Sequence, residues 1–293
     1  MFAKIAAECP TIVFVAHGGP LEPQAALLAA SLHDAYLPRK IVCRVMEPVE
    51  QWTALGDDLT AFLDSLGVEI IPCRNGVDDE YKHGNKIGAL GGINGRALFL
   101  DTDIMLMTPL SWHHNLTGAA ALKPADIDTF SNGGGSWARV WRAFDRDVPP
   151  RTLTATISGT PMRPYYNAGF ISVQDGDAFT NTWLEVARKI DADESIGNKR
   201  PWLDQIALPV TFAELGWDVD VLGDAFNFPC HLADVGDMAP YFAHYHYAKT
   251  LAAQPKLRFR VAQLMALYPA LAPILSRFKG WAGLVREIRK KAI

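Results

Sequence analysis

The first hundred residues alternate short apolar runs with segments of helical spacing, and this alternation constrains the fold more than any other feature. Thr11 to Ala16 is an apolar, β-branched run that ends in a glycine turn, and the apolar residues from Leu21 to Leu32 then recur at helical intervals. Further strands are predicted at 40–45, 68–72 and 96–100, with helices at 49–66 and 81–91. Strands alternating with helices predict a largely parallel, doubly wound α/β sheet.

Beyond Pro109 the chain has polar, glycine-rich loops around shorter apolar runs. The segment 131–136 is predicted to be a loop or lid, because its glycines would lose too much backbone entropy in a helix or central strand. Strands are expected at 168–173, 217–222 and 241–246, and helices at 178–190 and 203–208. We expect one domain over 1–250, divided into halves 1–108 and 109–250, followed by a tail of short amphipathic helices over 251–293.

The net charge of -4 hides an asymmetry. Residues 251–293 hold nine Lys/Arg and one acid, so the tail is near +8 and the rest of the chain near -12. An acidic body argues against a nucleic-acid partner, which would need a basic face for phosphates. The basic tail fits either a helix packed on the domain with a solvated face or peripheral contact with an anionic membrane surface.

Neither end of the chain carries a long apolar run. The N-terminal stretch has no apolar run near the length of a membrane span, and the sequence predicts a cytoplasmic protein, in which the tail could lie at the inner membrane face. The four cysteines are widely spaced without a CxxC pair, which disfavours a zinc cluster or a disulfide framework.

Asp101-Thr102-Asp103 is the motif that points most clearly to chemistry. Five other Asp-x-Asp pairs occur, so the spacing itself is uninformative, but only this pair directly follows one apolar run, 97–100, and precedes another, 104–107. The carboxyl end of a central strand is where α/β sheets bind ligands. Two close carboxylates repel each other, and a divalent cation such as Mn²⁺ or Mg²⁺ relieves that repulsion and can bridge to a phosphate. The alternative is a pair of solvated acids in a turn.

Phe99 to Ile104 resembles the Asp-x-Asp segment of GT-A fold glycosyltransferases, most closely those of family 8, the glycogenin and lipopolysaccharide galactosyltransferase type. Other short motifs of that family follow in its order between residues 11 and about 250: Lys86, Tyr166 to Phe170, Leu203 to Gln205, Phe226 to Pro229, and His244 to His246 with Lys249. Their order carries the resemblance more than any single motif.

The resemblance implies a GT-A fold, with a Rossmann-like, mostly parallel central sheet flanked by helices, a nucleotide-binding half 1–108 and a smaller, mixed acceptor half 109–250. It further implies transfer of a sugar from a nucleoside-diphosphate sugar, with a UDP-sugar favoured, to a hydroxyl of a glycan, a lipid-linked or a small-molecule acceptor. The expected anomeric outcome is retention. The oligomeric state is left open.

The resemblance assigns the metal to Asp101 and Asp103, with His244 or His246 as a further ligand. Alternation along a strand would point both histidines to the same face, so the sequence does not choose between them. Lys249 is assigned to the diphosphate. The family pattern His-x-x-Gly-x-x-Lys is broken here, because Lys249 follows His244 by five residues without an intervening glycine, so Lys86 or Arg163 could share that role.

Other residues receive donor-binding roles from the same resemblance. Ala16 and His17, at the end of the first strand, would hold the base and ribose, and Thr102 belongs to the donor site with its flanking aspartates. Asn167 and Gly169 would line the acceptor side of the donor sugar, where a glycine lets backbone approach closely. The simpler interpretation of Asn167 and Gly169 is a turn before a strand.

Asp204, Gln205 and Asn167 are the candidate catalytic residues. Asp204 and Gln205 would contact sugar hydroxyls or the reacting face, and Asp204 would be the base if the reaction inverted. A helix cap is the simpler role for Asp204.

Three other classes of protein share part of this sequence pattern. A haloacid-dehalogenase-like aspartyl phosphotransferase would use Asp101 as the nucleophile, but it expects a flexible pair such as Gly-Thr where this chain has Ile104-Met105. A sugar-phosphate nucleotidyltransferase would need a longer glycine-rich loop after the first strand. A non-catalytic nucleotide-sugar binding protein stays open.

Overall fold

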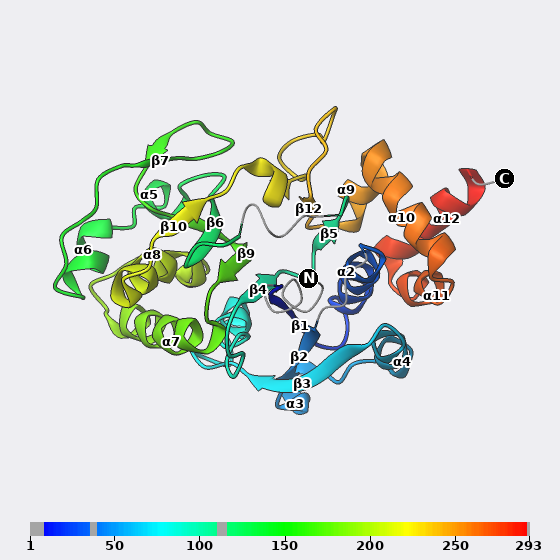
Figure 1. Cartoon of the computed structure of the whole chain (residues 1–293), viewed down its shortest axis with the longest axis horizontal. Coiled ribbons are helices and arrows are strands. Elements are labelled where there is room, and N and C mark those ends of the chain that lie inside the picture. The colour runs from blue at the N-terminus through cyan, green and yellow to red at the C-terminus, as the bar shows by residue number, and fades with distance from the viewer. Residues whose placement is uncertain (1–8, 36–39, 110–115, 292–293) are drawn as a thin grey trace, which may run out of the picture. The chain divides into compact units, whose positions relative to one another are not determined.

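The computed structural model describes residues 9–35, 40–109 and 116–291 (Figure 1). It confirms the predicted class: an α/β fold whose central sheet has seven mostly parallel strands flanked by helices. The described chain forms two compact units that are each discontinuous in sequence. The first comprises 9–73, 100–109 and 223–291, and the second 74–99 and 116–222.

The first unit begins with three strands in the order β1 (Thr11–Ala16), β2 (Ile41–Glu47) and β3 (Val68–Arg74). β1 and β2 are parallel, and α2 (Glu22–Asp34) follows the glycine turn as predicted. The single helix predicted over 49–66 is wrong. It is two helices, α3 (Val49–Trp52) and α4 (Asp57–Ser65), because the chain turns between them with Thr53 at a φ of 63°.

A small sheet of the first unit has the order β11 (Phe228–Pro229), β12 (Phe242–His244) and β5 (Ile104–Leu106), with the short 3-10 helix η2 (Asp224–Phe226) before β11. β12 runs antiparallel to β5, and His244 lies opposite Ile104. The predicted strand over 241–246 therefore ends at His244. This pairing joins the Asp-x-Asp segment to the histidine segment.

The tail forms four short helices, all in the first unit: α9 (Ala248–Ala253), α10 (Pro255–Leu267), α11 (Leu271–Ser276) and α12 (Lys279–Lys291). α10 and α11 pack beside α2 (Figure 1), where Arg260 pairs with Asp34 at 2.7 Å and Arg277 with Glu22 at 2.9 Å. Of the described helices, none combines the length and apolar character needed to cross a membrane. The last two residues of the tail lie outside the described chain.

The second unit contributes four strands in the order β10 (Val219–Val221), β6 (Ala120–Pro124), β9 (Tyr166–Val173) and β4 (Ala97–Leu100). β10 is parallel to β6, whereas β9 is antiparallel to it. A small hairpin joins β7 (Leu153–Thr154) to β8 (Pro161–Met162).

The helices of the second unit are α5 (Thr129–Asn132), α6 (Trp137–Arg142), α7 (Gly176–Ala192) and α8 (Leu203–Leu215). α7 packs on α8, with the buried rings of Phe179 and Phe212 stacked 5.5 Å apart. The predicted helix over 81–91 is wrong, since only the 3-10 helix η1 (Lys82–Lys86) forms before a series of turns. Glycines at 84, 88, 91 and 92 disfavour a regular helix there.

Candidate functional site

Asp101-Thr102-Asp103 forms a tight turn between β4 and β5 in the first unit. The N–H of Ile104 donates to the carbonyl of Asp101 at 3.2 Å, which closes the turn. The hydroxyl of Thr102, a buried residue, donates to Oε1 of Gln24 on α2 at 3.3 Å. The motif is therefore anchored to the helix that follows the first strand.

Asp103 lies between two imidazoles. Nε2 of His244 is 3.1 Å from Oδ1 of Asp103, and Nδ1 of His246 is 3.1 Å from Oδ2. Among the described residues, these three form a group whose candidate ligand atoms all lie within 4.8 Å of one another. Carboxylate oxygens and imidazole nitrogens are common metal ligands, so the residues present fit a divalent ion.

The two neighbouring histidines also change the pKa of Asp103. Burial alone would raise the pKa of this carboxyl group, but the charges and hydrogen bonds of His244 and His246 outweigh it and hold the pKa well below its usual value. Asp103 is therefore a carboxylate and a competent ligand across the physiological range. Asp101, half-buried in the same turn, lies outside the group of three.

The remaining candidates of the first unit lie at the end of β1 and in the first turn of α9. Nδ1 of His17 is 2.8 Å from the carbonyl oxygen of Gly18, and its ring lies 5.5 Å from that of Trp52. Gly18 is required by close packing, since a Cβ there would lie 2.1 Å from the carbonyl oxygen of Ala54. Lys249 is the second residue of α9, with its Nζ 5.1 Å from the ring centre of Tyr247. Ala16 is the buried last residue of β1.

In the second unit, Asp204 is almost fully buried at 1% exposure beside Lys86. Nζ of Lys86 lies 3.5 Å from Oδ2 of Asp204, and the hydroxyl of Tyr81 donates to Oδ1 at 3.1 Å. Burial, reinforced by the charge of Asp204, raises the pKa of Tyr81, so this phenol stays protonated and a donor. Asp204 is thus fixed near the start of α8, and the half-buried Gln205 follows it.

Asn167 and Gly169 are brought together with a carboxylate that sequence reasoning missed. Oδ1 of Asn167 accepts from the N–H of Gly169 at 2.8 Å, and its Nδ2 donates to Oδ2 of Asp126 at 3.3 Å. Asp126 also accepts from the hydroxyl of Thr156 at 2.8 Å and pairs with Lys123, whose side chain is fully buried. A lysine inside the apolar run 120–124 was the available signal, because a buried charge needs a partner.

Arg163, the other candidate cation, lies in the same unit and donates to the carbonyl oxygen of Pro149. Lys86 also lies 5.9 Å from the ring centre of Phe99 at the end of β4. Among the second unit's predicted site residues, Lys86 and Asp204 therefore form a charged pair, and Asn167 and Gly169 form a hydrogen-bonded pair.

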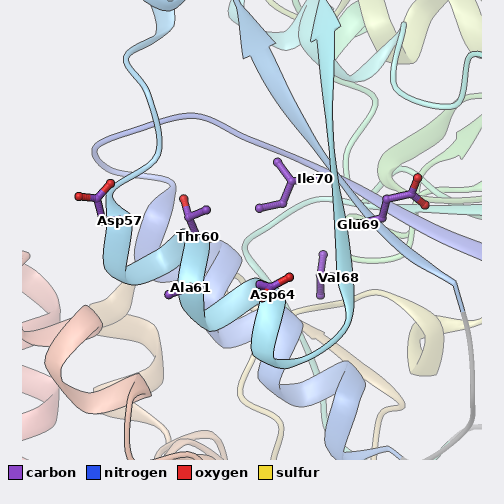
Figure 2. Close-up of a pocket in the computed structure, with 7 residues that line it drawn as sticks. All are labelled: Asp57, Thr60, Ala61, Asp64, Val68, Glu69 and Ile70. Atoms are coloured by element: carbon purple, nitrogen blue, oxygen red, sulfur yellow. The ribbon is translucent and has the colours of Figure 1, made fainter.

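A groove of about 520 Å³ lies elsewhere in the first unit, between α4 and β3 (Figure 2). It contains none of the predicted site residues and is lined by Asp57, Thr60, Ala61, Asp64, Val68, Glu69 and Ile70. Three carboxylates would repel a diphosphate, so this groove does not suit a nucleotide.

Comparison with known proteins fits this geometry. The model of the Rhodobacterales glycosyltransferase domain matches residues 12–216. The structure is similar to the galactosyltransferase LgtC, solved with donor and acceptor sugar analogues, at a TM-score of 0.54 and 13% identity over 94% of this chain and 99% of that one. It is also similar to the glycosyltransferase GlyE of Streptococcus pneumoniae TIGR4, at a TM-score of 0.50 and 14% identity over 97% of this chain.

The chain spans 65% of the length of the solved GlyE chain, and no curated protein matches it significantly. At such low identity the two solved structures establish only the GT-A type of fold. The family model covers well over half of the chain. The protein therefore belongs to the Rhodobacterales glycosyltransferase domain family, and sugar transfer is the activity of its class.

Proposed function

We propose that this protein transfers a hexosyl group from a nucleoside-diphosphate sugar to an acceptor hydroxyl with the help of a divalent cation. The observation that supports this most is the convergence of Asp103 with two histidines directly after an apolar strand, in a chain of a glycosyltransferase family. Asp101 and Asp103 with a histidine would hold Mn²⁺ or Mg²⁺. The bound ion would neutralise charge on the departing nucleoside diphosphate.

Nucleotide binding is proposed for residues at the ends of the first strands. Ala16 ends β1 and His17 follows it, at the edge where parallel α/β sheets bind ligands, and they would contact the base and ribose of a UDP-sugar. Thr102, held by Gln24, would fix the orientation of the aspartates that flank it. Lys249 would approach the diphosphate as a point charge.

Sugar recognition is proposed for the polar residues of the second unit. Asp204 would be oriented by Lys86 and Tyr81 and would accept hydrogen bonds from donor-sugar hydroxyls, with Gln205 beside it. Asn167 uses both ends of its amide in contacts to Gly169 and Asp126, so its role would be to shape the sugar site. We expect the transfer to retain the anomeric configuration, as the resemblance to family 8 implies.

The experiment that tests this function is a screen of nucleotide sugars, with products identified by mass spectrometry and with Mn²⁺, Mg²⁺ or excess chelator present. Asp103→Asn should abolish Mn²⁺-dependent transfer or donor hydrolysis. Asp147→Asn is the matched control, because Asp147 belongs to another Asp-x-Asp pair and is exposed. Full wild-type activity in excess chelator would contradict the role of the metal.

We also propose that the protein works in the cytoplasm and that the tail contacts an anionic membrane near a lipid-linked acceptor. α10 buries Leu257, Val261 and Leu264 but leaves Phe259 and Leu267 at 65% and 58% exposure. Exposed aromatic and aliphatic groups among basic side chains suit an anionic interface. Co-sedimentation with phosphatidylglycerol vesicles, but not with phosphatidylcholine vesicles, is expected, and Phe259→Ser should weaken it. Equal binding to both vesicle types would contradict electrostatic attraction between the basic tail and an anionic membrane.

A further inference from the structure

We infer that His244 and His246 bind the metal together, and that this pair of imidazoles makes the site select first-row transition-metal ions over Mg²⁺. The inference rests on the proposed function in one respect, because the ion concerned is the one assigned there to the diphosphate. It goes further by fixing the ligand set and the class of ion. His246 is the residue that determines the selectivity.

The distances fit two nitrogens and a carboxylate on one ion. Nε2 of His244 and Nδ1 of His246 each lie 3.1 Å from an oxygen of Asp103. Adjacent ligands of an octahedral ion with bonds of about 2.1 Å are about 3.0 Å apart. The ring centres of His244 and His246 are 3.9 Å apart, so the two imidazoles lie beside each other next to Asp103.

The backbone reaches this arrangement through a strained turn. In a continuing strand, alternate residues would be about 6.6 Å apart, too far for the observed ring separation. Instead β12 ends at His244, His246 has a φ of 55°, and the N–H of Tyr247 donates to the carbonyl of Tyr245 at 2.6 Å. These are features of the rare three-residue turn with a positive central φ, which is strained for a residue other than glycine.

Two contacts hold the turn in place. The N–H of Tyr245 donates to the carbonyl of Asp103 at 3.0 Å, and Nε2 of Gln24 donates to the carbonyl of His246 at 3.4 Å. Gln24 also accepts from Thr102, so a single side chain on α2 supports both the aspartate turn and the histidine turn. Strain that is held by surrounding contacts points to a function for the strained residue.

The donor set decides which ions the site accepts. Mg²⁺ is a hard ion that prefers carboxylate, carbonyl and water oxygens, whereas imidazole suits the transition metals, whose affinities rise from Mn²⁺ to Cu²⁺. Two imidazoles beside the aspartate carboxylates would therefore disfavour Mg²⁺ more strongly than a site with one imidazole. Replacing one imidazole with an oxygen donor should reduce the discrimination.

His246→Asn is the sharpest test, because asparagine tolerates a positive φ and offers a hard oxygen in place of nitrogen. The control is His231→Asn: the His231 ring lies 3.8 Å from that of His246, but the residue is exposed and outside the ligand group. Affinities for Mn²⁺ and Mg²⁺ are measured by calorimetry without nucleotide, and nitrogen ligands of bound Mn²⁺ are counted by pulsed electron paramagnetic resonance.

Wild type and His231→Asn should show two imidazole nitrogens on Mn²⁺ and bind Mn²⁺ much more tightly than Mg²⁺. His246→Asn should show one imidazole nitrogen on Mn²⁺. Its preference for Mn²⁺ over Mg²⁺ should fall at least about tenfold, because even the loss of a residue that only supports a ligand lowers metal affinity by about that factor. One nitrogen in the wild type, or an unchanged preference in His246→Asn, would overturn the inference while leaving metal-dependent transfer intact. Chelator-resistant transfer would instead contradict the proposed function.

Discussion

Replacing Lys123 with methionine tests the polar cluster of the second unit. The side chain of Lys123 is fully buried and pairs with Asp126, whose side chain is 11% exposed. Removing one partner of a buried ion pair costs about 3–5 kcal/mol, because the other charge is left uncompensated. Asp126 would keep the donors of Thr156 and Asn167, so we expect the lower end, about 3 kcal/mol. This corresponds to a fall of roughly 6–12 °C in melting temperature.

The matched control is Lys40→Met. Lys40 lies 2.8 Å from Glu69, but these side chains are 54% and 50% exposed, and such a pair contributes at most about 1 kcal/mol. Free energies of unfolding from urea titrations followed by circular dichroism would compare the two variants. Lys123→Met with Asp126→Asn should cost less than the sum of the single changes. A loss for Lys123→Met no larger than that for Lys40→Met would refute the burial argument.

Three further predictions follow from individual contacts. Gln24→Ala should weaken Mn²⁺ binding about 10–100-fold, as expected for a residue that supports ligands, with the circular dichroism spectrum unchanged; calorimetry showing unaltered affinity would contradict this. The pKa of Asp103 is lowered in the folded state. The carboxylate therefore contributes stability above the unfolded pKa of about 3.9, and this contribution is lost as the pH falls through the folded pKa. Metal-free wild type should accordingly lose stability more steeply in acid than Asp103→Asn. Burial raises the pKa of Cys43 and of Cys230 to about 12, so a thiol reagent at pH 8 should modify at most the other two cysteines until the protein is unfolded.

Much of the fold could be predicted because its signals are local. β1 matches its predicted span, Thr11 to Ala16, since a β-branched run followed by a glycine turn leaves little alternative. The errors fell where local signals conflict with backbone geometry. The helical spacing of 49–66 hides the turn at Thr53, and the apolar residues of 81–91 suggested a helix that the interspersed glycines do not support.

The candidate site was predictable in its residue types but not in its arrangement. The sequence indicated Asp103, His244 and His246, yet it could not show that both histidines contact one carboxylate, because that depends on a turn with a positive φ after β12. The contribution of Gln24 could not be predicted either, since the contact joins residues 222 positions apart. Such pairings follow from tertiary structure, which periodicity does not encode.

The most direct measurement of the central claim is the change in melting temperature that a nucleoside diphosphate produces with and without Mn²⁺. If the ion joins Asp103 to the phosphates, UDP or GDP should stabilise the protein only when Mn²⁺ is present, by about 2.7 kcal/mol at a ligand concentration of 100 times Kd. Asp103→Asn should remove the effect. An equal shift in the presence of excess chelator would contradict a metal-bridged donor site.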